Sequence, residues 1–309
     1  MTTISRRGLL LGGAGLLVLS GCAPVASSPA EPGKPATPTG PMGISAIPDQ
    51  DPEKLSRLYS SVAERFASTT GLEVNYLPVT DYTAVERAFE VGDIAIAWMG
   101  GLTGVQARSR VKGATAIAQR DIDAQFHSLF IATIASGLVP ITQADGLSEL
   151  AGHTFTFGSE TSTSGRLMPE YFLKQAKFDL KNLRGEPGFS GSHDATIAAV
   201  ASGSFDVGAV NEQVWKKTVE LAEVDLSAVQ VLWRTPGYAD YHWLARPDVD
   251  ETFGAGTLAA VTDMLLGLDA SNSDDAVILD LFGASSFIET TNSNYDQIEA
   301  VAKDLGLLV

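Results

Sequence analysis

Apolar and polar positions along this chain alternate with two different periods. Residues 52–70 place Leu55, Leu58 and Val62 on one side of a helix, so this segment predicts an amphipathic helix. Residues 94–98 are a short apolar run, which is typical of a buried strand. Short strands that alternate with helices indicate an α/β fold.

The alternation continues through residue 305. The predicted strands are 44–47, 72–77, 94–98, 114–118, 129–135, 154–157, 206–210 and 229–233. The predicted helices are 52–70, 82–90, 166–174, 195–202, 212–222, 257–268 and 294–305. This order favours parallel or mixed sheets covered by helices, which bind ligands beyond the carboxyl ends of their strands.

Polar clusters follow several of these strands. They are Pro48–Pro52, Thr80–Tyr82, Gly100–Gly104, Ser159–Gly165, Ser190–Asp194 and Asn211–Glu212. Turns are polar in any fold, so a single cluster would mean little. Six clusters at equivalent positions predict one shared cleft.

The loop Gly158-Ser-Glu-Thr-Ser-Thr-Ser-Gly165 is the most specific of these clusters, since it joins a predicted strand to a predicted helix. A helix start offers free N–H groups and the positive end of the helix dipole, and both favour an anion. N-capping would need only one hydroxyl, whereas residues 161–164 alone have four. We therefore expect Ser162, Thr163 and Ser164 to bind an anion. Because Pro169 lacks an N–H, the helix either starts near Met168 or starts near Ser164 and kinks.

The N-terminus has the pattern of a lipoprotein signal peptide. Arg6 and Arg7 precede a short apolar run, and Leu-Ser-Gly-Cys22 ends the segment. We predict a signal peptide at 1–21 and a lipid-bearing Cys22, with export by the twin-arginine or the general secretory route. Residues 22–42 contain six prolines and predict an extended tether.

Charge and composition exclude several function classes. The formal net charge is −16, and removing residues 1–21 takes away two arginines and no acid, so it falls to −18. Such an acidic protein is a poor nucleic-acid binder. Cys22 is the only cysteine, and no two of the four histidines lie three or four residues apart. We expect no metal and no cofactor.

Two alternatives to anion binding have some support in the sequence. Ser190, His193 and Asp194 have the side chains of a serine hydrolase, although neighbours in sequence seldom form a relay. Tyr82, Trp98 and Tyr241 could instead stack on an organic ligand. Of these, Tyr82 is expected to be exposed because it follows Asp81 in a loop.

Several motifs resemble the phosphate, phosphite and phosphonate substrate-binding proteins of ABC importers, and most closely a branch named for selenate. They are Ile47–Leu55, Val79–Tyr82, Trp98–Gln106, Gln119–His127, Phe155–Met168, Gly185–Asp194, Asn211–Trp215, Trp233–Pro236 and Asp240–Trp243. The resemblance covers essentially residues 43–309.

The resemblance implies a type II periplasmic-binding fold with two α/β lobes of mixed sheets. One lobe would combine 43–133 with 240–309, and the other would be 134–239. Strands would cross between the lobes near Phe130–Ala135 and near Tyr238–Tyr241. The expected partners are the ABC permease and ATPase subunits, and the expected state is a lipid-anchored monomer that is not an enzyme.

The same resemblance places the ligand loops on specific residues. They are Asp81, Tyr82, Gly100, Gly101, His127, Ser159, Ser162, Thr163, Ser164, Ser192, His193, Asp194 and Asn211. We add His242, which borders the second predicted crossing. The ligand is expected to be selenate, phosphite, phosphate or a phosphonate. A carboxylate in the site, from Asp81, Asp194 or Glu212, would accept a proton from phosphite or phosphate and would repel selenate.

Overall fold

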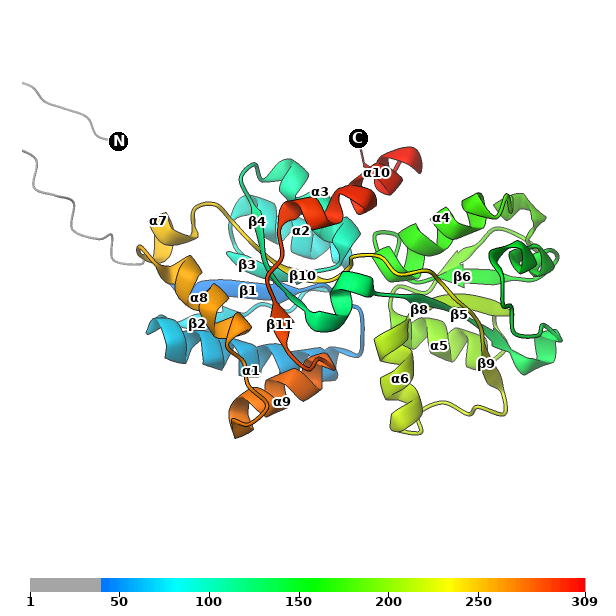
Figure 1. Ribbon diagram of the computed structural model, residues 1–309, viewed down its shortest axis with the longest axis horizontal. Coiled ribbons are helices and arrows are strands. Elements are labelled where there is room, and N and C mark those ends of the chain that lie inside the picture. The colour runs from blue at the N-terminus through cyan, green and yellow to red at the C-terminus, as the bar shows by residue number, and fades with distance from the viewer. Residues whose placement is uncertain (1–39, 309) are drawn as a thin grey trace, which may run out of the picture. The chain divides into compact units, whose positions relative to one another are not determined.

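The computed structural model describes residues 40–308 (Figure 1). The predicted signal peptide, Cys22 and the tether up to residue 39 lie outside the described residues. The tether was predicted to extend to Met42, but the first strand already begins there. Within residues 40–308, no helix combines the length and apolar character that crossing a membrane requires.

The elements have the following bounds. The strands are β1 (Met42–Ala46), β2 (Val74–Tyr76), β3 (Ile96–Met99), β4 (Thr115–Arg120), β5 (Ser128–Thr133), β6 (Phe155–Phe157), β7 (Gly188–Phe189), β8 (Val207–Asn211), β9 (Val229–Arg234), β10 (His242–Ala245) and β11 (Phe287–Ile288). The helices are α1 (Pro52–Thr70), α2 (Tyr82–Val91), α3 (Gly101–Arg110), α4 (Met168–Gln175), α5 (His193–Ala201), α6 (Glu212–Glu220), α7 (Val249–Phe253), α8 (Thr257–Leu266), α9 (Ser273–Phe282) and α10 (Asp296–Asp304).

The strands form two mixed sheets, which confirms the predicted fold class. The first sheet has the order β11-β4-β10-β3-β1-β2, with β10 antiparallel to both of its neighbours. The second has the order β7-β6-β8-β5-β9, with β5 antiparallel to β8 and β9. Parallel pairing within each sheet requires crossover helices.

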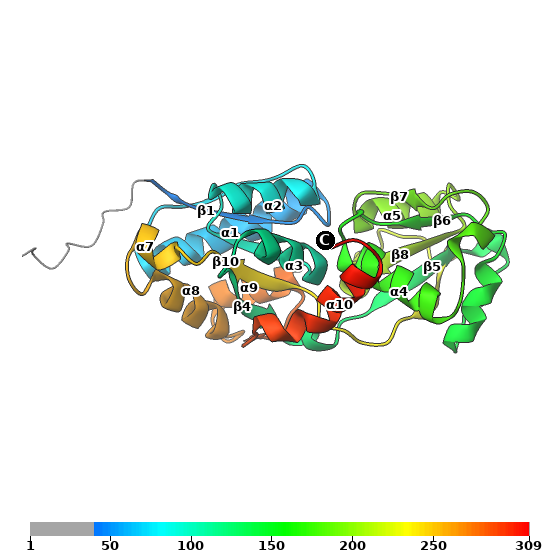
Figure 2. The same ribbon diagram turned by 90° about the horizontal axis from the view of Figure 1, so that it is seen from above.

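Helices cover both faces of the first sheet. Figures 1 and 2 show α2 and α3 on one face and α1, α8 and α9 on the other. Helix α1 begins as its sequence predicts: the Asp51 carboxylate accepts hydrogen bonds from the N–H groups of Glu53 and Lys54, and Pro52 occupies the first turn. Its bounds match the prediction because the caps and the apolar spacing agree.

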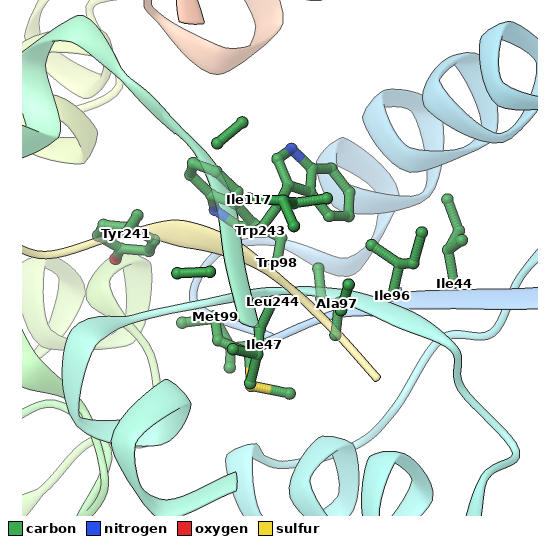
Figure 3. Close-up of a cluster of buried hydrophobic side chains, with 14 of the residues drawn as sticks. Ile44, Ile47, Ile96, Ala97, Trp98, Met99, Ile117, Tyr241, Trp243 and Leu244 are labelled. Atoms are coloured by element: carbon green, nitrogen blue, oxygen red, sulfur yellow. The ribbon is translucent and has the colours of Figure 1, made fainter. Parts of the chain in front are cut away.

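The core of the first sheet is rich in aromatic side chains. Trp98 of β3 packs against Trp243 of β10 with ring centroids 5.6 Å apart. Figure 3 shows both indoles with Tyr241 at one end of this cluster and Ile44 at the other. Because strand residues alternate between faces, Tyr241 and Trp243 share one face of β10 and His242 lies on the other.

The second sheet buries both of its faces. Phe130 and Ala132 of β5 pack into one core with Leu173 of α4. Leu129 and Ile131 pack into another core beneath α5 and α6. Alternate side chains of β5 therefore enter two different cores. Because both faces of the strand are buried, its sequence is a nearly continuous apolar run.

The connection between the sheets differs from the prediction. β5 was assigned to the first lobe up to residue 133, but it pairs only with strands of the second sheet. The first crossing therefore lies near Phe126 and His127 and not at Phe130–Ala135. There Phe126 and Tyr238 exchange two backbone hydrogen bonds, of 2.8 and 3.0 Å, so the two crossing segments run side by side.

Some elements were missed in the sequence. Helix α3 begins in a glycine-rich segment that was predicted to be a polar loop. At its start, Gly100 and Gly101 pack closely against other backbone atoms and side chains. Helix α9 and the short strands β7, β10 and β11 also escaped prediction. Tertiary contacts rather than local periodicity stabilise these elements.

Candidate functional site

The Ser162–Gly165 segment opens a helix with an unusual first turn. Residues Thr163–Leu167 form a π-helical turn that continues into α4, and the Ser162 hydroxyl accepts the N–H of Gly165 at 2.9 Å. Helix α4 proper therefore starts at Met168, as the first alternative had it, and a π turn that begins in the hydroxyl cluster precedes it.

Pro169 leaves carbonyls of this turn free for other partners. Proline cannot donate to the carbonyl four residues earlier, and its ring would clash with it. That carbonyl belongs to Gly165, which instead accepts the N–H of Gly158 at 2.9 Å. The neighbouring carbonyl of Ser164 accepts the hydroxyl of Ser128 at 2.8 Å. These two hydrogen bonds fix the junction between β6 and α4 to the second sheet.

A second helix start faces this one. Gly100 is the N-cap of α3 and has no capping side chain, so the first N–H groups of α3 find their partners elsewhere. The N–H of Leu102 donates to the Thr163 hydroxyl at 2.9 Å, and the N–H of Gly101 donates to Asp240 at 3.0 Å. A Cβ on Gly100 would lie 3.0 Å from the Thr163 oxygen, so this approach depends on glycine. Two positive helix ends converge here.

Further polar side chains from both sheets close the site. The Nδ1 atom of His193 accepts the N–H of Asn211 at 3.2 Å, and its Nε2 atom lies 3.5 Å from the Ser164 hydroxyl. The Tyr241 hydroxyl lies 3.4 Å from the same Nε2 atom and donates to Asp49 at 2.9 Å. We call Ser162, Thr163, Ser164, His193 and Asp240 the anion cluster.

The anion cluster is deeply buried, with the three hydroxyl residues only 1–2% exposed. Buried polar atoms nearly always have hydrogen-bond partners. Among the described residues, however, Asp240 Oδ2 and the Tyr82 hydroxyl make no hydrogen bond of good geometry. Unused polar atoms beside convergent helix ends indicate a binding site.

Burial dominates the protonation states in and around the cluster. It raises the pKa of Asp240 to about 7 and that of Asp49 to about 6. It lowers the pKa of His193 to about 3. Desolvation penalises the charged form in each case, so His193 is neutral at pH 7 while Asp240 can hold or release a proton there.

Several predicted site residues have other roles in the structure. Asp81 is exposed and caps α2 by accepting the N–H of Ala84 at 2.8 Å. Ser192 caps α5, and Asp194 accepts the N–H of Asp51 at 2.8 Å. Glu212 pairs with Arg234, with both oxygens at 2.9 Å. These carboxylates use their oxygens outside the anion cluster, and Ser159 is a half-buried residue of the loop that leads to it.

The aromatic and histidine predictions also need revision. Tyr82 was expected to be exposed, but it is the first residue of α2 and is 2% exposed, because a capped helix turns it inward. His242 packs against Tyr295 with ring centroids 4.0 Å apart, on the opposite face of β10 from Tyr241. His127 lies in the first crossing, where its Nδ1 atom contacts the Thr235 carbonyl at 2.7 Å. The structure therefore brings neither histidine into the anion cluster.

The sequence did not single out two carboxylates that the structure places at the site. Asp49 and Asp240 lay within motifs quoted for the resemblance, but no local signal distinguished them from surface acids. Both are at least 96% buried. Only the pairing of distant segments reveals them, because each contacts residues more than 100 positions away.

The hydrolase alternative lacks its geometry. The Ser190 hydroxyl bonds to Thr156 at 2.7 Å, and the Asp194 carboxylate bonds to a backbone N–H. Neither reaches His193. For the stacking alternative, Trp98 and Tyr241 stack on each other with ring centroids 5.7 Å apart, and Tyr82 is buried. Residues 40–308 contain no group of three His, Cys, Asp or Glu side chains that could hold a metal ion.

The comparison with known families decides the class of protein. The profile of the family described as "ABC transporter, phosphonate, periplasmic substrate-binding protein" matches residues 44–295. The chain belongs to this phosphonate-binding family. It is therefore an extracytoplasmic substrate-binding protein of an ABC importer. The hydrolase hypothesis is excluded, because the relatives are solute-binding proteins and not enzymes.

Individual members of the phosphonate-binding family agree with this assignment. The chain is 42% identical over 263 residues to the "Probable ABC transporter phosphite binding protein PhnD1" of Prochlorococcus marinus (strain MIT 9301), covering 85% of this chain and 89% of that one. The crystal structure of PhnD1 in complex with methylphosphonate matches with a TM-score of 0.84 and covers 86% of this chain and 98% of that one. A binding protein of an ABC phosphonate transporter from Pseudomonas aeruginosa, 20% identical, shares the fold with a TM-score of 0.71 and covers 84% of each chain.

Proposed function

We propose that this protein captures phosphite or a short phosphonate in the anion cluster and delivers it to its permease. One observation carries the proposal: three buried hydroxyls lie at the start of one helix, and the middle one, of Thr163, accepts the Leu102 N–H in the first turn of another. Such an arrangement holds a tetrahedral oxyanion through local dipoles, which suits a protein whose net charge is −16. The 42% identical PhnD1, which binds methylphosphonate in its crystal structure, supports the same ligand class.

Asp240 favours ligands that carry a proton. Its buried Oδ2 atom makes no hydrogen bond of good geometry within residues 40–308, although the Thr163 hydroxyl lies close enough to lower the pKa of this carboxylate, and burial raises that pKa to about 7. Phosphite, phosphate and methylphosphonate can donate a proton to a carboxylate near neutral pH, whereas selenate and sulfate cannot. A fully ionised dianion would meet repulsion from Asp240. We therefore rank selenate below the phosphorus oxyanions.

The proposal includes a lipid anchor on Cys22 and a tether that reaches to the folded part. Its support is the lipoprotein-type segment of the sequence and the extracytoplasmic location of the family. Mass spectrometry of the membrane-extracted protein tests it, because a diacylglyceryl mass on Cys22 is expected. Unmodified Cys22, or cleavage elsewhere, would contradict the anchor.

A thermal-shift panel tests the ligand. Phosphite, methylphosphonate, phosphate, sulfate and selenate are each added to the purified protein at pH 7. A ligand at 100 times its Kd stabilises the folded state by about 2.7 kcal/mol, which is a shift of several degrees for a domain of this size. We expect shifts with phosphite and methylphosphonate. A panel in which no phosphorus oxyanion raises the melting temperature would contradict the proposed function.

A further inference from the structure

A cavity of about 250 Å³ lies against the anion cluster, on the far side of Tyr241. Its walls come from both halves of the fold: Trp98 belongs to β3 of the first sheet and Tyr59 to α1, which covers that sheet, whereas Lys217 belongs to α6 beside the second sheet. Lys217 and Asp280 are exposed and lie 3.7 Å apart at its edge. The other walls combine aromatic side chains with polar ones, among them Gln50, Arg120 and Gln213.

Three side chains separate this cavity from the anion cluster. Asp49, Asn211 and Tyr241 line the cavity, whereas none of the five anion-cluster residues does. The Tyr241 hydroxyl donates to Asp49 at 2.9 Å, accepts from Asn211 Nδ2 at 2.9 Å and lies 3.4 Å from His193 Nε2. Tyr241 is thus the central member of a hydrogen-bonded partition, with the anion cluster on one side and the cavity on the other.

The ring of Tyr241 is held firmly in this position. It stacks on Trp98 at 5.7 Å and contacts Phe126 at 5.5 Å. The Arg120 guanidinium lies 5.0 Å from the Tyr241 ring centroid, and Arg120 is itself fixed by two hydrogen bonds of 2.7 Å to Asp123. Figure 3 shows Tyr241 at the margin of the aromatic core. A ring packed on several sides cannot swing aside without disturbing that core.

We propose that Tyr241 sets the length of the ligand by closing the anion cluster off from the neighbouring cavity. This inference rests on the proposed function, since it concerns the same site. We expect an oxyanion with no substituent or a one-carbon substituent to bind on the cluster side. A longer phosphonate needs room for its alkyl chain, and the Tyr241 ring blocks the way from the anion cluster into the neighbouring cavity. Since a water molecule takes up about 30 Å³ of liquid, the cavity could hold a chain of several carbon atoms.

The experiment is a calorimetric titration of phosphite, methylphosphonate, ethylphosphonate and propylphosphonate into the purified protein. For the wild type, we expect propylphosphonate to bind at least 50-fold more weakly than methylphosphonate, on the order of a two-methylene penalty in a pocket that excludes them. Tyr241→Ala should reduce that ratio at least tenfold by joining the two spaces. Tyr241→Phe removes the hydroxyl but keeps the ring, so it should keep the wild-type ratio even if every affinity falls.

Leu58→Ala is the matched control. Leu58 is a buried residue of α1 that lines the cavity and is not one of the three partition residues. Its truncation enlarges the cavity without opening it to the anion cluster, so the ratio should not change. Circular dichroism establishes folding of each variant, and Tyr241→Leu replaces Tyr241→Ala if the latter does not fold.

The outcomes distinguish failure of the proposed function from failure of the inference about Tyr241. If neither phosphite nor methylphosphonate binds to the wild type, the proposed function fails. If they bind but propylphosphonate binds as tightly as methylphosphonate, the inference about Tyr241 fails alone. It fails equally if folded Tyr241→Ala or Tyr241→Leu keeps the wild-type ratio, or if Leu58→Ala lowers the ratio as much as they do.

Discussion

The hydroxyl of Thr163 accepts the backbone N–H of Leu102 at 2.9 Å, joining the first turn that follows β6 to the first turn of α3. The two residues are 61 positions apart. Each lies at the start of a helix that follows a strand, and the two strands belong to different sheets. A ligand at this point contacts both sheets, so binding and closure of the two lobes are expected to be coupled.

Replacing Thr163 should therefore affect both stability and binding. Thr163→Val keeps the shape but leaves the Leu102 N–H without its acceptor, which costs about 1–3 kcal/mol for a buried group. Affinity for phosphite should fall at least tenfold. Thr163→Ser retains the hydroxyl and should stay close to the wild type. Urea denaturation and calorimetry measure the two effects, and equal affinity in the Val and Ser variants would contradict the role of this hydroxyl.

Asp240 should make the folded state less stable as the pH rises. Its pKa is about 7 in the folded state and near 3.8 when exposed, so between these values the unfolded chain releases a proton that the folded chain keeps. Stability is then lost at about 1.4 kcal/mol per pH unit from this group. Asp240→Asn lacks this loss and can still accept the Gly101 N–H. Its free energy of unfolding, measured in urea from pH 4 to 8, should rise relative to the wild type with pH. A pH-independent difference would show that Asp240 is not buried as described.

His242 has the opposite pH dependence. Burial lowers its pKa from 6.5 to about 3, so its contribution to stability is present above pH 6.5 and is lost as the pH falls. His242→Phe preserves a ring against Tyr295 and removes the titrating group. The wild type should lose about 1.4 kcal/mol per pH unit relative to this variant between pH 6.5 and 4. If His242 faced solvent or a ligand oxyanion, that difference would be absent or reversed.

The buried ion pair of Arg120 and Asp123 should matter more than the ion pairs on the surface. Arg120 supports the aromatic core at Trp98 and donates to the Phe282 carbonyl at 2.8 Å. Asp123→Ala leaves the guanidinium buried and unpaired, which is expected to cost about 3–5 kcal/mol. Asp304→Ala breaks the exposed pair with Lys174 and should cost less than about 1 kcal/mol. Similar destabilisation by both substitutions, in denaturant titrations, would argue against this ranking.

Sequence patterns predicted most of the fold, and they pointed to part of the candidate site. Helix α1 was located to the residue because its caps and its periodicity agree. The Ser162–Ser164 anion site was proposed from local chemistry alone, because hydroxyl residues between a predicted strand and a predicted helix can be recognised in the sequence. The places of Asp49, Asp240 and Tyr241 beside the anion cluster could not be predicted, because they depend on segments that meet only in the folded chain. His242 was misassigned because a single strand residue does not reveal which face it occupies.

A crystal structure of the protein with methylphosphonate tests the central claim most directly. The account predicts that the phosphonate oxygens lie within hydrogen-bond distance of the Ser162, Thr163 and Ser164 hydroxyls or of the N–H groups beside them, with the methyl group directed toward Tyr241. Methylphosphonate bound elsewhere in the protein, with these hydroxyls making no contact to it, would contradict the account.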